Sequence, residues 1–154
     1  MKKATKKLQL GQLSNKLGQW SRLEDAIVPQ KGWINAVRTS FGMSMRQMAM
    51  RINKSTSAIQ KLEKSEAKGK ITLQSLRDAA KAFDMKLVYG LVPREGTLEG
   101  IIERRAKELA IEIVKRTNRT MVLEDQKVSD KRLKREVHEL TKELIDEMPR
   151  ILWD

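Results

Sequence analysis

The chain has 154 residues with a formal net charge of +12, 40% hydrophobic residues and no cysteine. This length allows one domain or two small ones, and the hydrophobic content permits a buried core. The absence of cysteine excludes disulfides and thiolate metal sites, and no apolar run reaches the length of a signal or membrane segment. We therefore expect a cytoplasmic protein without a membrane partner. Aromatic residues make up only 4% of the chain and prolines number three, which predicts an all-α architecture.

Residues 1–32 are expected to form an N-terminal arm and one amphipathic helix. Apolar residues recur at spacings of three and four over residues 5–27, and Pro29 and Gly32 end the run. This helix would pack on its own core or on a partner. The lysine-rich segment 1–7 reads equally well as an arm that follows a nucleic-acid groove and as a solubilising tail.

Residues 42–63 contain two short amphipathic runs that meet at a tight corner. Ser44 is a natural N-cap for the first run, whose apolar positions are Met48, Ala49 and Ile52. Asn53 tolerates the left-handed backbone that ends such a helix, and Ser55 caps a second helix. The pattern predicts a helix-turn-helix.

Flanking segments supply packing partners for this corner. Upstream, the apolar positions are Trp33, Ile34, Val37 and Phe41, and downstream they are Leu73, Leu76, Ala79, Ala80 and Phe83. Four helices around one small core would hold the corner rigid.

The second helix of the corner leaves a polar face that suits a DNA major groove. Base-reading residues are expected to be Thr56, Ser57, Gln60 and Lys61. Phosphate contacts are expected from Ser44, Arg46, Lys54, Lys64 and Lys70, and the N-cap Ser55 completes the expected DNA-binding set.

Residues 33–85 resemble the Xre/Cro family of phage-repressor-like DNA-binding domains. The resemblance rests on Ala49 in the second helix and on the Ile-x-x-Leu-Glu run that ends at Glu63. It implies a lambda-repressor-like fold and an ion pair between Arg38 and Glu63. The sequence departs from the family at Met45, where a glutamine that touches DNA is usual, and at Ser65, where glycine is usual. These departures weaken the contact at position 45 and leave the fold unaffected.

Charge is segregated along the chain. Residues 1–96 hold 19 Lys plus Arg against 7 Asp plus Glu, whereas residues 97–154 hold 13 against 13. The basic excess therefore lies in the part that carries the helix-turn-helix, which favours a polyanionic partner, double-stranded DNA. We accordingly expect the protein to be associated with the nucleoid.

Residues 86–95 are predicted to form one short strand, because β-branched and aromatic residues precede Pro93. No second strand is apparent, so this strand would pair with a copy of itself across a two-fold axis or with another protein. A homodimer of this kind would read a palindromic operator.

Residues 96–154 are predicted to form a helical hairpin with a turn near Ser129 and Asp130. Its apolar stripes serve either to complete a core and support dimerisation or to hold a protein partner such as a toxin.

The full chain resembles the mobile mystery protein A family, which has the same order of parts. The residues behind this resemblance include Lys31–Ile34, Leu62–Ala67, Leu91–Glu95, Thr120–Met121 and Leu152–Asp154. The family is usually found beside a Fic-domain protein. The resemblance implies a DNA-binding repressor that is also the antitoxin and autoregulator of a Fic-type toxin.

An alternative makes toxin neutralisation the main role and DNA binding secondary. Fic enzymes are restrained by a helix of pattern Ser/Thr-x-x-x-Glu-Gly/Asn, and Thr120 and Glu124 fit its first five positions while Asp125 breaks the sixth. A spacing of four places both side chains on one helical face, but so loose a pattern also arises by chance.

Catalysis by the chain itself is not expected. His138 is the only histidine, the carboxylates are interleaved with lysine and arginine, and the glycines are scattered singly. We therefore predict no catalytic residue, no metal site and no cofactor.

Overall fold

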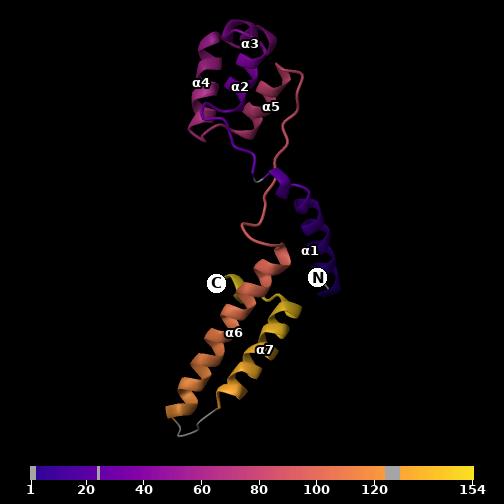
Figure 1. Ribbon diagram of the computed structural model, residues 1–154, viewed down its shortest axis with the longest axis vertical. Coiled ribbons are helices and arrows are strands. Elements are labelled where there is room, and N and C mark those ends of the chain that lie inside the picture. The colour runs from indigo at the N-terminus through magenta and orange to yellow at the C-terminus, as the bar shows by residue number, and fades with distance from the viewer. Residues whose placement is uncertain (1–2, 24, 124–128) are drawn as a thin grey trace. The chain divides into compact units, whose positions relative to one another are not determined.

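The computed structural model describes residues 3–23, 25–123 and 129–154 and divides the chain into two compact units (Figure 1). The central unit is Asp25–Gly90, and the terminal unit combines Met1–Glu24 with Leu91–Asp154. Every regular element within the described residues is helical, which confirms the all-α class. No helix in the described part of the chain is both long and apolar enough to cross a membrane.

The central unit consists of four short helices around one core. They are α2 (Trp33–Ser40), α3 (Met45–Arg51), α4 (Thr56–Ala67) and α5 (Leu73–Lys81). Three begin at a hydroxyl cap: Ser44, Ser55 and Thr72 each accept a hydrogen bond from the backbone N–H three residues later. The core is built on Ile34, Met48, Ala49, Ile59, Ala79, Ala82 and Phe83. All of these apolar positions except Ala82 follow from the periodicity of the sequence.

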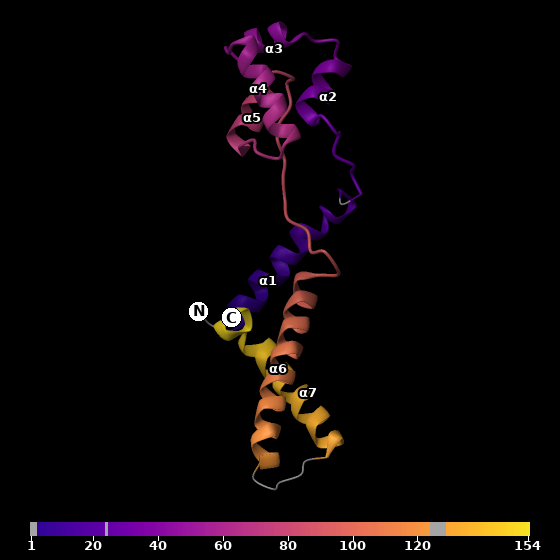
Figure 2. The same cartoon turned by 90° about the vertical axis from the view of Figure 1, so that its left-hand side faces the viewer.

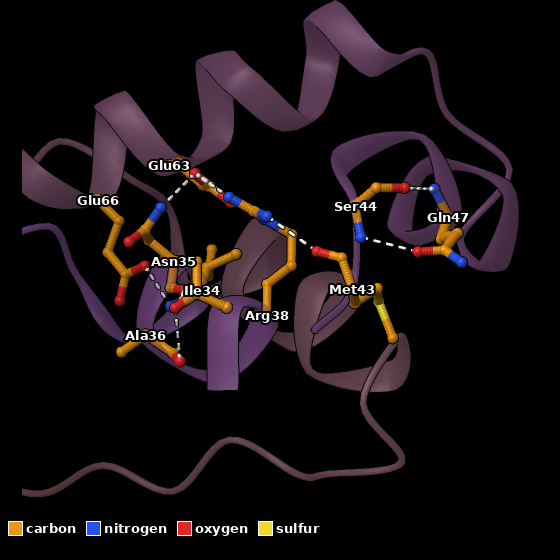
Figure 3. Close-up of polar contacts among 10 residues, drawn as sticks. Ile34, Asn35, Ala36, Arg38, Met43, Ser44, Gln47, Glu63 and Glu66 are labelled. Atoms are coloured by element: carbon orange, nitrogen blue, oxygen red, sulfur yellow. Dashed lines mark hydrogen bonds and ion pairs between the residues drawn. The ribbon is translucent and has the colours of Figure 1, made fainter. Parts of the chain in front are cut away.

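Helix α4 is fastened to α2 by two of its carboxylates (Figure 3). The Glu63 carboxylate accepts hydrogen bonds from Arg38 Nε at 2.5 Å, Arg38 Nη2 at 3.2 Å and Asn35 Nδ2 at 2.9 Å. The Glu66 carboxylate accepts from the backbone N–H groups of Trp33 and Ile34, at 2.8 and 2.9 Å. Glu66 thereby caps α2, whose N-cap residue Gly32 has no side chain to do so.

Arg38 also ties α2 to the segment that leads into α3. Its Nη1 donates to the Met43 carbonyl at 2.9 Å, in addition to the bonds with Glu63. Arg38 and Glu63 are both buried, at 8% and 7% exposure. One guanidinium therefore connects α2, the α2–α3 loop and α4, which fixes how the helix-turn-helix corner leaves the bundle.

The terminal unit is an antiparallel pair of long helices with two additions. Helices α6 (Leu98–Leu123) and α7 (Asp130–Glu147) lie side by side (Figure 1 and Figure 2), and Ser129, where a turn is predicted, caps α7. Their core contains Ala106, Leu109, Ala110, Leu144 and Leu152. Leu152 belongs to η2 (Arg150–Trp153), where the Arg105 guanidinium donates to the Leu152 carbonyl.

Helix α1 (Lys3–Gly18) packs on α6 and is held largely by polar contacts. Lys3 pairs with Glu147, Lys7 pairs with Asp146, and the Ser14 hydroxyl donates to Glu99 at 2.7 Å. No described side chain of α1 is buried. The predicted helix over residues 5–27 is therefore too long at its C-terminal end: α1 ends at Gly18, and a short 3₁₀ turn, η1 (Ser21–Leu23), follows. Glycine is a weak helix former, and the Ser21 hydroxyl donates to the Gly18 carbonyl instead of letting the helix continue.

The predicted strand over residues 86–95 is wrong. Residues 86–93 carry no regular secondary structure, and no strand occurs in the described ranges. Val88, Tyr89 and Leu91 are 58%, 61% and 82% exposed. β-Branched and aromatic composition favours a strand only where a neighbouring strand pairs with its backbone groups, and this segment has none. The dimer contact expected from that strand has no basis in this fold.

Gly32 is predicted to be intolerant of any side chain. Its φ is +86°, and an added Cβ would lie 2.7 Å from Glu66 Cδ. Gly32→Ala should therefore destabilise the central unit by about 2–3 kcal/mol, through backbone strain and displacement of the α2 cap. Hydrogen exchange of α2–α5 amides in the full chain measures the loss.

Gly42→Ala is the matched control. Gly42 also has a positive φ, +64°, but an added Cβ would meet nothing within 4 Å. Gly42→Ala should therefore destabilise the central unit only by the backbone strain at this position, about 1 kcal/mol. Equal losses in the two variants would show that the Glu66 cap contributes nothing at Gly32.

Candidate nucleic-acid interface

The corner between α3 and α4 is closed by backbone geometry that the sequence anticipates. Asn53 adopts a left-handed conformation with φ +53°, and the Lys54 N–H donates to the Ala49 carbonyl at 2.9 Å. Ser55 then caps α4. The corner therefore presents the N-terminal turn of α4, where backbone N–H groups give the helix its positive end.

Helix α4 has one buried and one exposed side. Ile59 and Glu63 face the core at 0% and 7% exposure. The exposed positions recur at spacings of three and four and are Thr56, Ser57, Gln60, Lys61, Lys64 and Ala67. All ten residues that the sequence predicts to touch DNA are exposed, namely Ser44, Arg46, Lys54, Ser55, Thr56, Ser57, Gln60, Lys61, Lys64 and Lys70. We refer to these ten as the polar rim.

The internal contacts of α4 leave the polar rim positively charged. α4 carries Lys61 and Lys64 against Glu63 and Glu66, so its formal charge is balanced. Both carboxylates, however, are turned onto α2, and neither lysine forms an ion pair within the described residues. The acids neutralise groups inside the bundle, and the lysines remain available to an external anion.

The wider charge of the central unit has the same sign. Residues 25–90 contain 12 Lys plus Arg against 5 Asp plus Glu, a net charge of +7. Such a surface attracts phosphate backbones and binds them in a salt-dependent way.

Two of the rim hydroxyls have a structural function as well. Ser44 Oγ accepts from the Gln47 N–H at 3.1 Å, and Gln47 Oε1 accepts from the Ser44 N–H at 2.8 Å (Figure 3). Ser55 Oγ accepts from the Ala58 N–H at 3.2 Å and lies 3.2 Å from Ser57 Oγ. A hydroxyl that accepts one bond can still donate its proton, so both serines combine capping with the capacity to donate to a phosphate.

The two departures from the Xre/Cro pattern have different structural consequences. Met45 is partly buried and packs against the core of the central unit, which leaves no side chain in the place of the usual glutamine to reach DNA. At Ser65 the helix simply continues to Ala67, and the left-handed residue that follows is Gly69, with φ +66°.

The function of Glu66 was missed by sequence reasoning. Its signal was indirect: α2 begins after Gly32, and a helix start without a capping side chain needs an acceptor from elsewhere. A contact between α3 and the end of α5 was also missed, in which Arg51 Nε donates to the Ala82 carbonyl at 2.6 Å.

Only one residue of the predicted toxin-inhibitory pair lies in the described part of the chain. Thr120 is exposed near the end of α6, and its hydroxyl donates to the Arg116 carbonyl at 3.3 Å. Glu124 lies outside the described residues. His138 is exposed on α7, and the described residues contain no cluster of three or more His, Asp or Glu side chains that would hold a metal ion.

A family model for helix-turn-helix proteins matches residues 34–89. The matched segment is similar to helix-turn-helix domains of the Xre and lambda-repressor type, which points to a DNA-binding transcription regulator. Comparison with curated proteins and with solved structures gave no match.

The Glu63 carboxyl makes the stability of this domain depend on pH. Burial raises its pKa, but the hydrogen bonds from Arg38 and Asn35 and the Arg38 charge outweigh burial, and the pKa lies below its usual range. As the pH falls, the Glu63 carboxyl is therefore protonated in the unfolded chain before it is protonated in the folded chain. The contribution of Glu63 to stability should be fully present above the ordinary glutamate pKa, about 4.3. It should be lost as the pH falls through the lower pKa of the folded state.

Glu63→Gln should remove this part of the acid dependence and also destabilise the domain at neutral pH by about 3 kcal/mol, because Arg38 would be left as a buried unpaired charge. Denaturant titrations between pH 3 and 7 measure both effects. Glu112→Gln, at an exposed pair with Arg116, is the control and should change little. An unaltered pH profile in Glu63→Gln would contradict the assignment.

Proposed function

We propose that this protein is a sequence-specific DNA-binding transcriptional repressor. In this proposal Thr56, Ser57, Gln60 and Lys61 read base edges in the major groove. Backbone phosphates are held by Ser44, Arg46, Lys54, Ser55, Lys64 and Lys70. This function requires neither a cofactor nor a catalytic group.

One observation carries the proposal: five residues of the polar rim, Thr56, Ser57, Gln60, Lys61 and Lys64, are exposed on the rigid helix α4, whose own acids are engaged inside the bundle. Rigidity matters because base reading requires side chains at fixed positions, and α4 is fixed by Glu63 and Glu66. The free lysines Lys61 and Lys64 supply the favourable charge. A rigid helix together with available lysines distinguishes a surface that reads bases from one that only attracts phosphates.

We further propose that two copies bind one operator. A single helix-turn-helix reads only a short half-site, and such domains commonly act as two-fold dimers on inverted repeats. Selection of binding sites from random duplexes is therefore expected to return an inverted repeat with half-sites about 10 base pairs apart. A single unrepeated half-site would argue for a monomer.

The selected operator then allows base reading to be tested. Gln60→Ala should weaken binding to it by about 1–3 kcal/mol and relax the preference at one base pair. Gel-shift titration against every substitution at each operator position measures both quantities.

Lys64→Ala is the matched control on the same helix. It should weaken operator and random duplexes alike and lower the salt slope of binding by about 1. If Gln60→Ala also weakened random DNA by the same factor, Gln60 would be a phosphate contact and the base-reading assignment would be wrong.

The resemblance to the mobile mystery protein A family supports a narrower role, that of antitoxin and autoregulator for a neighbouring Fic-type toxin. As the alternative, Thr120 and Glu124 would act as a toxin-inhibitory helix and DNA binding would be secondary. The exposure of Thr120 is compatible with such contact. An adjacent reading frame with the Fic signature His-x-Phe-x-Asp/Glu-Gly-Asn-Gly-Arg is expected; its absence would favour a regulator without that partner.

A further inference from the structure

The hairpin of the terminal unit contains a groove of about 580 Å³ between α6 and α7. Ten residues line it, five from each helix: Lys107, Ile111, Val114, Lys115, Asn118, Leu133, Lys134, Val137, His138 and Thr141. Along α6 these positions recur at spacings of three and four, so the groove follows one side of the hairpin over about three helical turns. The two helices bury their shared core on Ala106, Ala110 and Leu144 and leave this side open.

The groove combines an apolar floor with a basic rim. Ile111, Val114, Leu133 and Val137 supply the floor, and Lys107, Lys115 and Lys134 are exposed at its edges. No lining residue is acidic, although residues 97–154 as a whole contain as many acids as bases. None of the three lysines forms an ion pair with another described residue. As far as the described residues go, the groove therefore has an uncompensated positive charge, in a region whose acids and bases are equal in number.

The apolar floor and the lysines of the groove indicate what kind of segment would bind there. A groove between two antiparallel helices accepts a third helix, whose apolar stripe fills the floor as in a three-helix bundle. The flanking positions of that helix would meet the lysines and should be Glu or Asp. Asn118 adds a polar feature, because its Oδ1 is buried and lacks a hydrogen-bond partner in the described part of the chain. Such an atom is rare in folded proteins, and Asn118 is the uncharged polar residue of the α6 side of the groove.

Helices of this chain do not fit that description. α1 contains four lysines and no acid, and α6 has more bases than acids. α7 has six acids against five bases, but its apolar residues Leu140, Leu144 and Ile145 are packed into the core of its own hairpin. α4 is balanced, and both of its acids are engaged within the central unit. Among its described residues, a second copy of the chain therefore offers no acidic helix with a free apolar stripe, so the occupant belongs to a different protein.

We propose that the α6–α7 groove is a docking site for an acidic amphipathic helix of a partner protein. The floor supplies binding free energy through apolar burial, and Lys107, Lys115 and Lys134 select the acidic flanks. This site is separate from the polar rim and does not depend on DNA binding by the central unit.

The test uses a fluorescein-labelled helical peptide with leucine at positions i, i+3, i+4, i+7 and i+11 and glutamate between them. Fluorescence anisotropy with the full-length protein should show saturable binding. A peptide with lysine in place of each glutamate should not bind. Lys115→Glu combined with Lys134→Glu should weaken binding of the acidic peptide at least about tenfold, because two attractive charges become repulsive.

Lys131→Glu combined with Lys142→Glu is the matched control, since both residues are exposed on α7 and neither lines the groove. This control should bind the peptide like the unaltered chain. Circular dichroism shows that each variant keeps its helices, which separates loss of the site from loss of the fold.

Three outcomes would overturn the proposal. In the first, the acidic peptide shows no specific binding: it fails to bind, or it binds the Lys115→Glu and Lys134→Glu double variant (the groove variant) and the control equally well. In the second, sedimentation would show self-association that only the groove variant abolishes. This result would assign the groove to a second copy of the chain. In the third, gel shifts would show that the groove variant loses duplex binding while the control keeps it. This result would make the groove a nucleic-acid contact. Failure of the repressor proposal would appear separately, as loss of DNA binding with peptide binding intact.

Discussion

The buried pair of Arg38 and Glu63 is the interaction on which the candidate interface depends. Its charges lie almost out of contact with water, and it persists because each partner's hydrogen bonds are satisfied: Glu63 by Arg38 and Asn35, and Arg38 by Glu63 and the Met43 carbonyl. The pair sets the relation of α2 to α4 and holds the loop before α3. Glu66 completes the attachment by capping α2.

These internal contacts also decide the charge of the exposed surface. α4 has equal numbers of acids and bases in sequence, so composition alone predicts a neutral helix. Folding places the acids against α2 and the lysines outside, and the same residues that stabilise the domain thereby create a cationic face. Stability and the proposed DNA binding are coupled through Glu63 and Glu66, although neither is expected to touch DNA. In the terminal unit, residues 97–154 likewise hold equal numbers of acids and bases, yet the charged groups among the described residues that line the α6–α7 groove are all lysines.

Sequence reasoning failed where a segment's structure depended on a partner. Residues 86–93 have strand-forming composition, but no neighbouring strand satisfies their backbone groups, and the segment remains irregular. The helix expected over residues 5–27 ends at Gly18, where the Ser21 hydroxyl donates to the Gly18 carbonyl, and α1 buries no side chain that would favour a longer helix. Met45 gave no sign in the sequence of whether it would face DNA or the core, and it packs against the core.

The sequence by itself determined the all-α class, the helix-turn-helix corner, the serine caps at Ser44 and Ser55, and the identity of the exposed residues on α4. These features depend on local spacing and on backbone preferences within a few residues. Only the tertiary structure revealed the Glu66 cap on α2, the Arg51 contact with α5 and the groove between α6 and α7. Those features join residues that are up to 33 positions apart or lie on different helices, and local periodicity contains no information about which distant groups will meet.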